Sequence, residues 1–152
     1  MKPSQKPETR LRVSRVIRAE RARVFEAWTR PELMQQWFCP QDLVVAEVEA
    51  DVRVGGKYRI AMKEKEARGK VFTTFGIYKE IVPGEKLVFT WEWEEPGQAE
   101  SLVTVTFFDK DGGTEVTVLH ERYVDMDGEN THQHGWTSAL ENLEIKLLNG
   151  VQ

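Results

Sequence analysis

The stretch GWTSALENLEIKLLNG, residues 135–150, decides the fold of this 152-residue chain. Its apolar residues recur at offsets of four, three and four, which makes one continuous stripe along a helix: Trp136, Leu140, Leu143 and Leu147. Asn149-Gly150 is a typical helix stop, and the pattern places the start of the helix between Gly128 and His134. No other helical pattern in the chain is long enough to cover a sheet.

The chain between residues 43 and 122 has the pattern of a strand-rich segment. Apolar residues alternate with polar ones in six runs, at 44–54, 58–62, 70–81, 87–93, 102–108 and 114–121. Turn signals separate the runs: Gly55-Gly56, Pro83-Gly84, and the polar stretch 109–113. We therefore expect a meandering antiparallel sheet in this part of the chain.

Before that segment, the period of the pattern changes twice. Residues 10–18 alternate as a strand does, and residues 21–28 carry apolar side chains at helical spacing. Thr29 with Glu32 resembles a capping box that opens a second short helix, which ends before Pro40. The fold class we predict is α+β: about seven antiparallel strands in a curved sheet around the C-terminal helix, with two short helices after the first strand. Residues 10–150 are predicted to form one domain, and residues 1–9 a flexible N-terminus.

Composition limits the classes of function. The formal net charge is −4, which argues against nucleic acid as a partner, and no apolar run approaches the ~18 residues of a membrane span. Cys39 is the only cysteine, and no secretory signal pattern follows Met1, so we expect a cytoplasmic protein. No cofactor motif is present.

The ordered motifs resemble the START-like (SRPBCC) helix-grip superfamily, which includes birch-pollen-allergen-like proteins and polyketide cyclases. More narrowly, they resemble the family named after the activator of the heat-shock-protein ATPase. The resemblance spans Leu11 to about Leu148, and these residues carry it: Arg15, Val24-Phe25-x-Ala27-Trp28-Thr29-x-Pro31-Glu32, Trp37, Asp51-x-Arg53-x-Gly55-Gly56, Gly76-x-Tyr78, Pro83, Leu87, Thr90-Trp91, His120, Gly135-Trp136, Leu140 and Leu143. The family hosts ligand carriers, cyclases and stress-response proteins, so the resemblance implies a fold more than a function.

Our first functional hypothesis is a cavity between the sheet and the C-terminal helix that binds a small hydrophobic or aromatic molecule. The predicted walls are Met62, Phe89, Trp91, Val105, Phe107, Val118, His120, Trp136 and Leu140. His120 shares a strand face with Val116 and Val118, and burial there is expected to lower its pKa below the ordinary ~6.5. The alternative is a purely structural role for His120, as a core histidine that hydrogen-bonds to a neighbour.

Two other classes of function remain open from the sequence. A cyclase- or hydrolase-like enzyme would use the same cavity, with His120 or a buried carboxylate such as Glu92 near the reacting carbon. No catalytic partner is evident: the chain has no nucleophile elbow, and no serine is predicted beside a plausible base, so we assign no catalytic residues. A co-chaperone domain acting on a heat-shock ATPase, as the family name implies, ranks last because a second domain is not seen.

The remaining polar motifs favour structural interpretations. His132 and His134 are two residues apart, so on a helix they point to different sides, and we predict no metal site. Cys39 is expected to be inert. Arg15 is a candidate ion-pair partner of the motif Asp51-x-Arg53. Ile145 lies off the helix stripe and is either a homodimer contact or a lone exposed residue.

Overall fold

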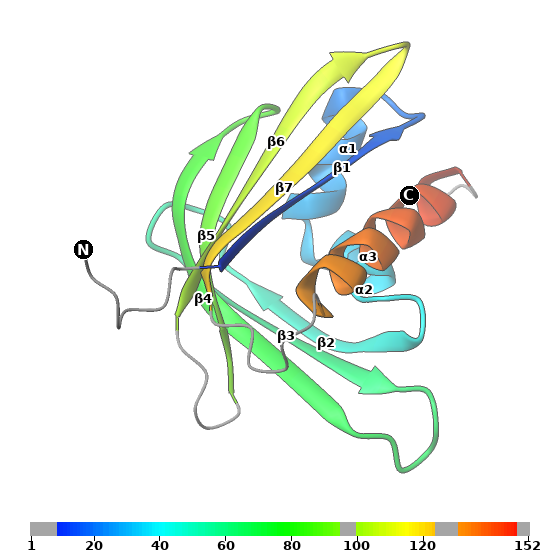
Figure 1. Cartoon of the computed structure of the whole chain (residues 1–152), viewed down its shortest axis with the longest axis vertical. Coiled ribbons are helices and arrows are strands. Elements are labelled where there is room, and N and C mark those ends of the chain that lie inside the picture. The colour runs from blue at the N-terminus through cyan, green and yellow to red at the C-terminus, as the bar shows by residue number, and fades with distance from the viewer. Residues whose placement is uncertain (1–8, 95–99, 124–130, 149–152) are drawn as a thin grey trace.

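Seven antiparallel strands form one curved sheet in the computed structural model, which describes residues 9–94, 100–123 and 131–148 (Figure 1). The strands are β1 (Thr9–Ile17), β2 (Leu43–Ala50), β3 (Lys57–Glu64), β4 (Val71–Val82), β5 (Lys86–Trp93), β6 (Ser101–Lys110) and β7 (Gly113–Tyr123). Their order across the sheet is β1-β7-β6-β5-β4-β3-β2. The predicted fold class is confirmed. The predicted flexible segment 1–9 lies outside the described residues except for Thr9.

Three helices complete the fold: α1 (Arg21–Thr29), α2 (Pro31–Trp37) and α3 (Thr131–Leu148). Figure 1 shows α3 on the concave side of the sheet, with α1 and α2 beside it. The helices make their main sheet contacts at the two sides of the sheet: α3 with β1, α2 with β2, and α1 with β6 and β7. Within the described residues, no helix is long and apolar enough to cross a membrane.

The junction between α1 and α2 differs from the prediction. Thr29 is the last residue of α1, and its hydroxyl donates a hydrogen bond back to the carbonyl oxygen of Phe25 at 3.0 Å. The N-cap of α2 is Arg30, which is extended because it precedes Pro31 at the first helical position. The predicted capping box from Thr29 to Glu32 is therefore wrong, because the proline shifts the start of α2 by one residue.

The β6–β7 hairpin sets the register of the sheet near the site. Its two-residue turn, Asp111-Gly112, has φ of 51° and 79°, which is the backbone twist that tight antiparallel hairpins prefer. Lys110 then pairs with Gly113, and the same register places Val103 opposite His120. The turn between Lys110 and Gly113 thus determines that Val103 and His120, seven positions further along each strand, lie opposite each other.

The Gly55-Gly56 motif connects β2 to β3, as predicted, but its two glycines serve different needs. Gly55 has a φ of 87°, which favours glycine. Gly56 is needed for space, since a Cβ there would overlap the carbonyl oxygen of Asp51. Arg53 pairs with Asp51 at 2.8 Å, whereas Arg15 does not join them.

Arg15 instead helps to anchor α3 to β1. Its guanidinium lies 2.8 Å from a carboxylate oxygen of Glu144, and the backbone N–H of Arg18 donates to the other oxygen at 3.2 Å. Burial alone would raise the pKa of Glu144, but these hydrogen bonds outweigh it and hold the pKa below 4.5. The anchor fixes α3 over the β1 side of the sheet.

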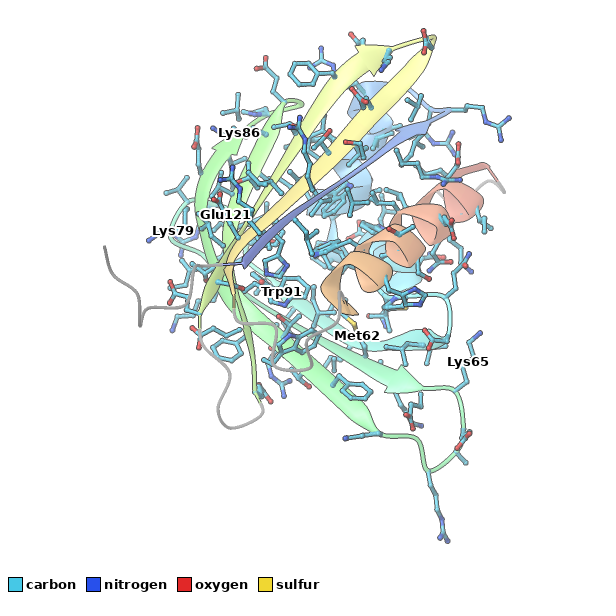
Figure 2. All side chains as sticks on the ribbon, viewed as in Figure 1. Met62, Lys65, Lys79, Lys86, Trp91 and Glu121 are labelled. Atoms are coloured by element: carbon cyan, nitrogen blue, oxygen red, sulfur yellow. The ribbon has the colours of Figure 1, made fainter. Side chains whose placement is uncertain are left out.

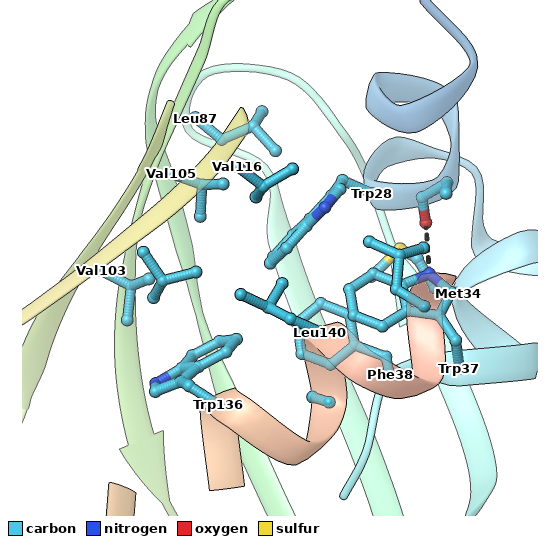
Figure 3. Close-up of a cluster of buried hydrophobic side chains, with 14 of the residues drawn as sticks. Trp28, Met34, Trp37, Phe38, Leu87, Val103, Val105, Val116, Trp136 and Leu140 are labelled. Carbon is cyan, nitrogen blue, oxygen red and sulfur yellow. Dashed lines mark hydrogen bonds between the residues drawn. The ribbon is translucent and has the colours of Figure 1, made fainter. Parts of the chain in front are cut away.

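One part of the concave face is filled completely, and we call it the packed core. Its members are at most 2% exposed: Trp28, Val105, Phe107, Val118 and Leu140. Figure 3 shows Trp28 and Leu140 filling the space between the helices and the sheet valines. Trp37 borders this cluster and donates its indole N–H to the carbonyl oxygen of Ala27 at 2.9 Å. Such dense packing of rings and branched side chains is a stabilising core.

Candidate functional site

The structure places all nine predicted wall residues in the interior, each at most 4% exposed. Four of them belong to the packed core: Val105, Phe107, Val118 and Leu140. The other five are Met62, Phe89, Trp91, His120 and Trp136. Figure 2 shows Met62 and Trp91 on the side of the sheet that faces α3, while Lys79 and Lys86 lie on the outer side. That these residues bind a ligand stays a prediction.

Trp91, on β5, is the centre of the second group. Its ring centroid lies 5.1 Å from that of Trp136 and 5.7 Å from that of His120. Trp93 meets it edge-on at 5.5 Å, and Phe38 stacks at 6.4 Å. Trp136 also stacks on Trp28 at 6.2 Å, so this indole from α3 connects the group around Trp91 to the packed core.

His120 is fully buried and bonded through both ring nitrogens. Trp136 donates its indole N–H to Nδ1 at 3.1 Å, so Nδ1 must be an acceptor. The other ring nitrogen, Nε2, lies 2.8 Å from Oγ of Ser101, which in turn donates to the carbonyl oxygen of Trp91 at 2.9 Å. This chain of hydrogen bonds fits a neutral imidazole with its proton on Nε2, which agrees with a structural role for His120 as a core histidine.

The structure places Ser101 beside His120, a contact that the sequence patterns did not predict. The β6–β7 hairpin makes Val103 the direct partner of His120, and Ser101 lies two residues further along the same strand face. Counting outward from the Asp111-Gly112 turn would have revealed this contact. The expectation that no serine lies beside a plausible base is therefore wrong.

The Ser101–His120 pair nevertheless lacks the arrangement of a nucleophile and its base. A base must accept the serine proton, but Nε2 of His120 carries a proton when Nδ1 accepts from Trp136. Glu92, the other acid-base candidate, is half-buried and lies opposite Phe75, on the face away from Trp91 and Trp93. The suggestion that Glu92 is a buried carboxylate of the site is thus wrong.

A row of apolar side chains continues the inner face beyond Trp91, and we call it the rim. It consists of Val45 on β2, Met62 on β3, Phe72 on β4 and Trp93 on β5. Met62 pairs directly with both Val45 and Phe72, and opposite residues share a sheet face. Met62 is buried, but the other three are only half-buried. The rim is therefore apolar surface on the inner face that the described residues cover incompletely.

Two indole N–H groups are buried and have no hydrogen-bond acceptor in the part of the chain that the structure describes: those of Trp28 and Trp91. Buried donors are nearly always paired in native proteins, because an unmet donor costs about 1–3 kcal/mol. Trp28 is enclosed by rings of the packed core and its border, while Trp91 touches Trp93 of the rim. The two unmet donors thus have different surroundings.

The remaining predicted features carry no chemistry of this site. Burial raises the pKa of Cys39 to about 11, so its thiol is protonated near neutral pH. His134 is exposed, and the side chain of His132 lies outside the described residues. Ile145 is 45% exposed. Among the described residues, no three His, Cys, Asp or Glu side chains come together as metal ligands.

This curved sheet with one long helix in its concave face, filled by rings rather than charges, defines a helix-grip protein with an apolar interior. The sequence model of the Activator of Hsp90 ATPase homolog 1-like protein family matches residues 18–147. The chain belongs to this family, which confirms the predicted membership. No curated protein sequence matches the chain.

Solved structures of similar proteins share the fold over nearly their whole length. A Chromobacterium violaceum protein is 28% identical, with a TM-score of 0.82 over 90% of this chain and 94% of that one. A Rhizobium leguminosarum protein, also 28% identical, has a TM-score of 0.79 over 94% and 96% of the two chains. The AHSA1 protein of Silicibacter pomeroyi is 24% identical, with a TM-score of 0.79 over 93% and 99%.

Proposed function

We propose that this protein binds a small hydrophobic or aromatic molecule at the inner face of the sheet, between the rim and Trp91. The observation that carries the proposal is the apolar row Val45, Met62, Phe72 and Trp93, which faces inward yet is only partly covered. Apolar surface gains about 25 cal/mol for each Å² removed from water, so a ligand lying on this row is stabilised without precise polar chemistry.

The position of the helices explains why the site lies at the rim. The main helix contacts with the sheet are made by β1, β2, β6 and β7, so three of the four rim residues, on β3, β4 and β5, belong to strands without a main helix contact. Lys70 covers one face of Phe72, with Nζ 5.3 Å from the ring centroid. The four predicted walls in the packed core would then hold the shape of the site without contacting the ligand.

Binding of N-phenyl-1-naphthylamine, an uncharged dye that fluoresces in apolar surroundings, tests this proposal. We expect saturable binding to the native protein. The substitution Phe72→Ala should weaken it about fivefold, because losing about 40 Å² of apolar contact costs about 1 kcal/mol. Phe108→Ala is the matched control, since Phe108 is an exposed ring (62%) opposite Glu115, near the β6–β7 turn. Absence of saturable binding, or equal weakening by both substitutions, would reject the proposal.

A further inference from the structure

The unmet indole N–H of Trp91 narrows the chemistry of the ligand. Trp91 is 4% exposed, and its Nε1 has no acceptor among the described residues. The backbone carbonyl of Trp91 is already bonded to Ser101, and the ring packs against Phe38, Trp93 and Trp136. Rings at these positions offer no oxygen to the donor. A molecule that enters beside Trp91 can supply the missing acceptor.

Resting on the function proposed above, we propose that the ligand is an uncharged apolar molecule with a carbonyl-type oxygen that accepts a hydrogen bond from Nε1 of Trp91. The oxygen satisfies a donor that otherwise stays buried and unmet. The apolar body of the ligand lies on the rim, next to Trp93. Ketones, esters and amides attached to an aromatic or alicyclic body have this combination of groups.

The surroundings of Trp91 argue for a neutral acceptor. Its ring neighbours are Phe38, Phe89, Trp93, Trp136 and the neutral His120. A carboxylate placed among them would lose most of its hydration and gain only one N–H donor, which is unfavourable. Lys70, which covers Phe72, is the one cation that the described contacts place on the rim. An anionic ligand would therefore have to bind at Lys70 rather than at Trp91.

Trp28 provides a matched comparison within the same molecule. It too has an unmet N–H, but its ring contacts are Trp37, Phe38, Phe107 and Trp136, all at most 4% exposed. A ligand on the rim cannot reach the indole N–H of Trp28, because none of the rings that contact Trp28 is half-exposed. Removing the N–H of Trp28 should therefore leave ligand selection unchanged.

Three naphthalenes of nearly the same shape test the inference: 2-acetylnaphthalene with a carbonyl oxygen, 2-isopropenylnaphthalene without one, and 2-naphthoate with a charge. Their dissociation constants are measured by calorimetry on the full chain. The ratio of ketone to alkene affinity should fall about tenfold in Trp91→Phe, which removes the N–H and keeps a ring, and should stay unchanged in Trp28→Phe. Naphthoate should bind less tightly than the ketone.

The outcomes separate this inference from the proposed function. If none of the probes binds the native protein, the proposed function fails. If the ketone and alkene bind but Trp91→Phe leaves their ratio unchanged, or if naphthoate binds most tightly, the inference fails while the proposed function stands. The native protein supplies a second test should Trp91→Phe not fold. The ketone should move the indole N–H resonance of Trp91 downfield, the alkene should not, and equal shifts would overturn the inference.

Discussion

The packed core and the rim occupy the same concave face, but they differ in what covers them. In the packed core, α1 and α3 seal the sheet, and residues such as Phe107 and Leu140 are at most 2% exposed. At the rim, Phe72 and Trp93 face the same interior and remain half-buried. Apolar residues on one inner face therefore divide into a part that is fully buried and a part that is only half-covered.

The position of α3 causes the difference. Glu144 ties the helix to Arg15 and Arg18 at the β1 edge, so the helix covers that side of the sheet. Trp136 is the side chain by which α3 reaches Trp91 on β5 and His120 on β7, and His120 in turn contacts Ser101 on β6. A helix anchored at one edge of a sheet can thus complete a core and still leave apolar side chains of other strands partly uncovered.

Trp136→Ala should give the largest effect, because this residue stacks on Trp28 of the packed core and also packs against Trp91. We expect a loss of about 3–5 kcal/mol in the free energy of unfolding, since a large buried ring is removed and Nδ1 of His120 loses its donor. Urea denaturation measures this loss. Phe108→Ala, at an exposed ring, should stay within about 0.5 kcal/mol. Similar losses for both would show that α3 does not close a core.

Glu144→Gln should have the next largest effect, because it weakens the anchor of α3. We expect a loss of about 1–3 kcal/mol near neutral pH. The folded-state pKa of Glu144 is lowered, so its contribution is fully present above pH 4.5 and is lost as the pH falls through the folded-state value below 4.5. The stability curves of the two proteins should therefore converge in acid.

Glu141→Gln is the control for the anchor. Glu141 lies 3.9 Å from the same Arg15 guanidinium, but its side chain is 42% exposed, and exposed pairs contribute little. Its substitution should change the free energy of unfolding by less than about 0.5 kcal/mol at any pH. A pH-independent loss in Glu144→Gln would contradict the assignment of a charged anchor.

Ser101→Ala tests whether His120 is held as a structural group. The substitution leaves the Nε2 proton without its acceptor, so we expect a loss of about 1–2 kcal/mol. In the native protein, nitrogen NMR should show a neutral ring protonated on Nε2. A ring protonated on Nδ1, together with an esterase activity that Ser101→Ala abolishes, would instead support the enzyme hypothesis.

Local patterns in the sequence predicted most of the fold. The helical spacing of the apolar residues predicts the stripe from Trp136 to Leu147, and the residue types Asp111-Gly112 predict a hairpin turn. The start of α2 was misplaced by one residue because the proline at position 31 outweighed the capping pattern. A local stretch of sequence is therefore enough to predict an element when its apolar residues have a clear periodicity or when a glycine or proline restricts its backbone.

The site was predicted less completely because it depends on pairing and coverage. The contact of Ser101 with His120 requires the register of β6 and β7, and the inward direction of Phe72 requires that of β3 and β4. The sequence predicts that Val105 and Leu140 face inward, but an inward direction does not determine whether a helix covers the residue. The placement of α1 and α3 over the sheet separates the packed core from the rim.

Methyl NMR during titration with N-phenyl-1-naphthylamine distinguishes a rim that binds the ligand from a packed core that only stabilises the fold. The methyl of Met62 and those of Val45 report on the rim, and those of Val105 and Leu140 report on the packed core. We expect saturable shifts at the rim and little change in the packed core. Saturable shifts confined to the packed core, or no saturable shift anywhere, would contradict the account, and absence of binding would favour a domain that acts through its outer surface.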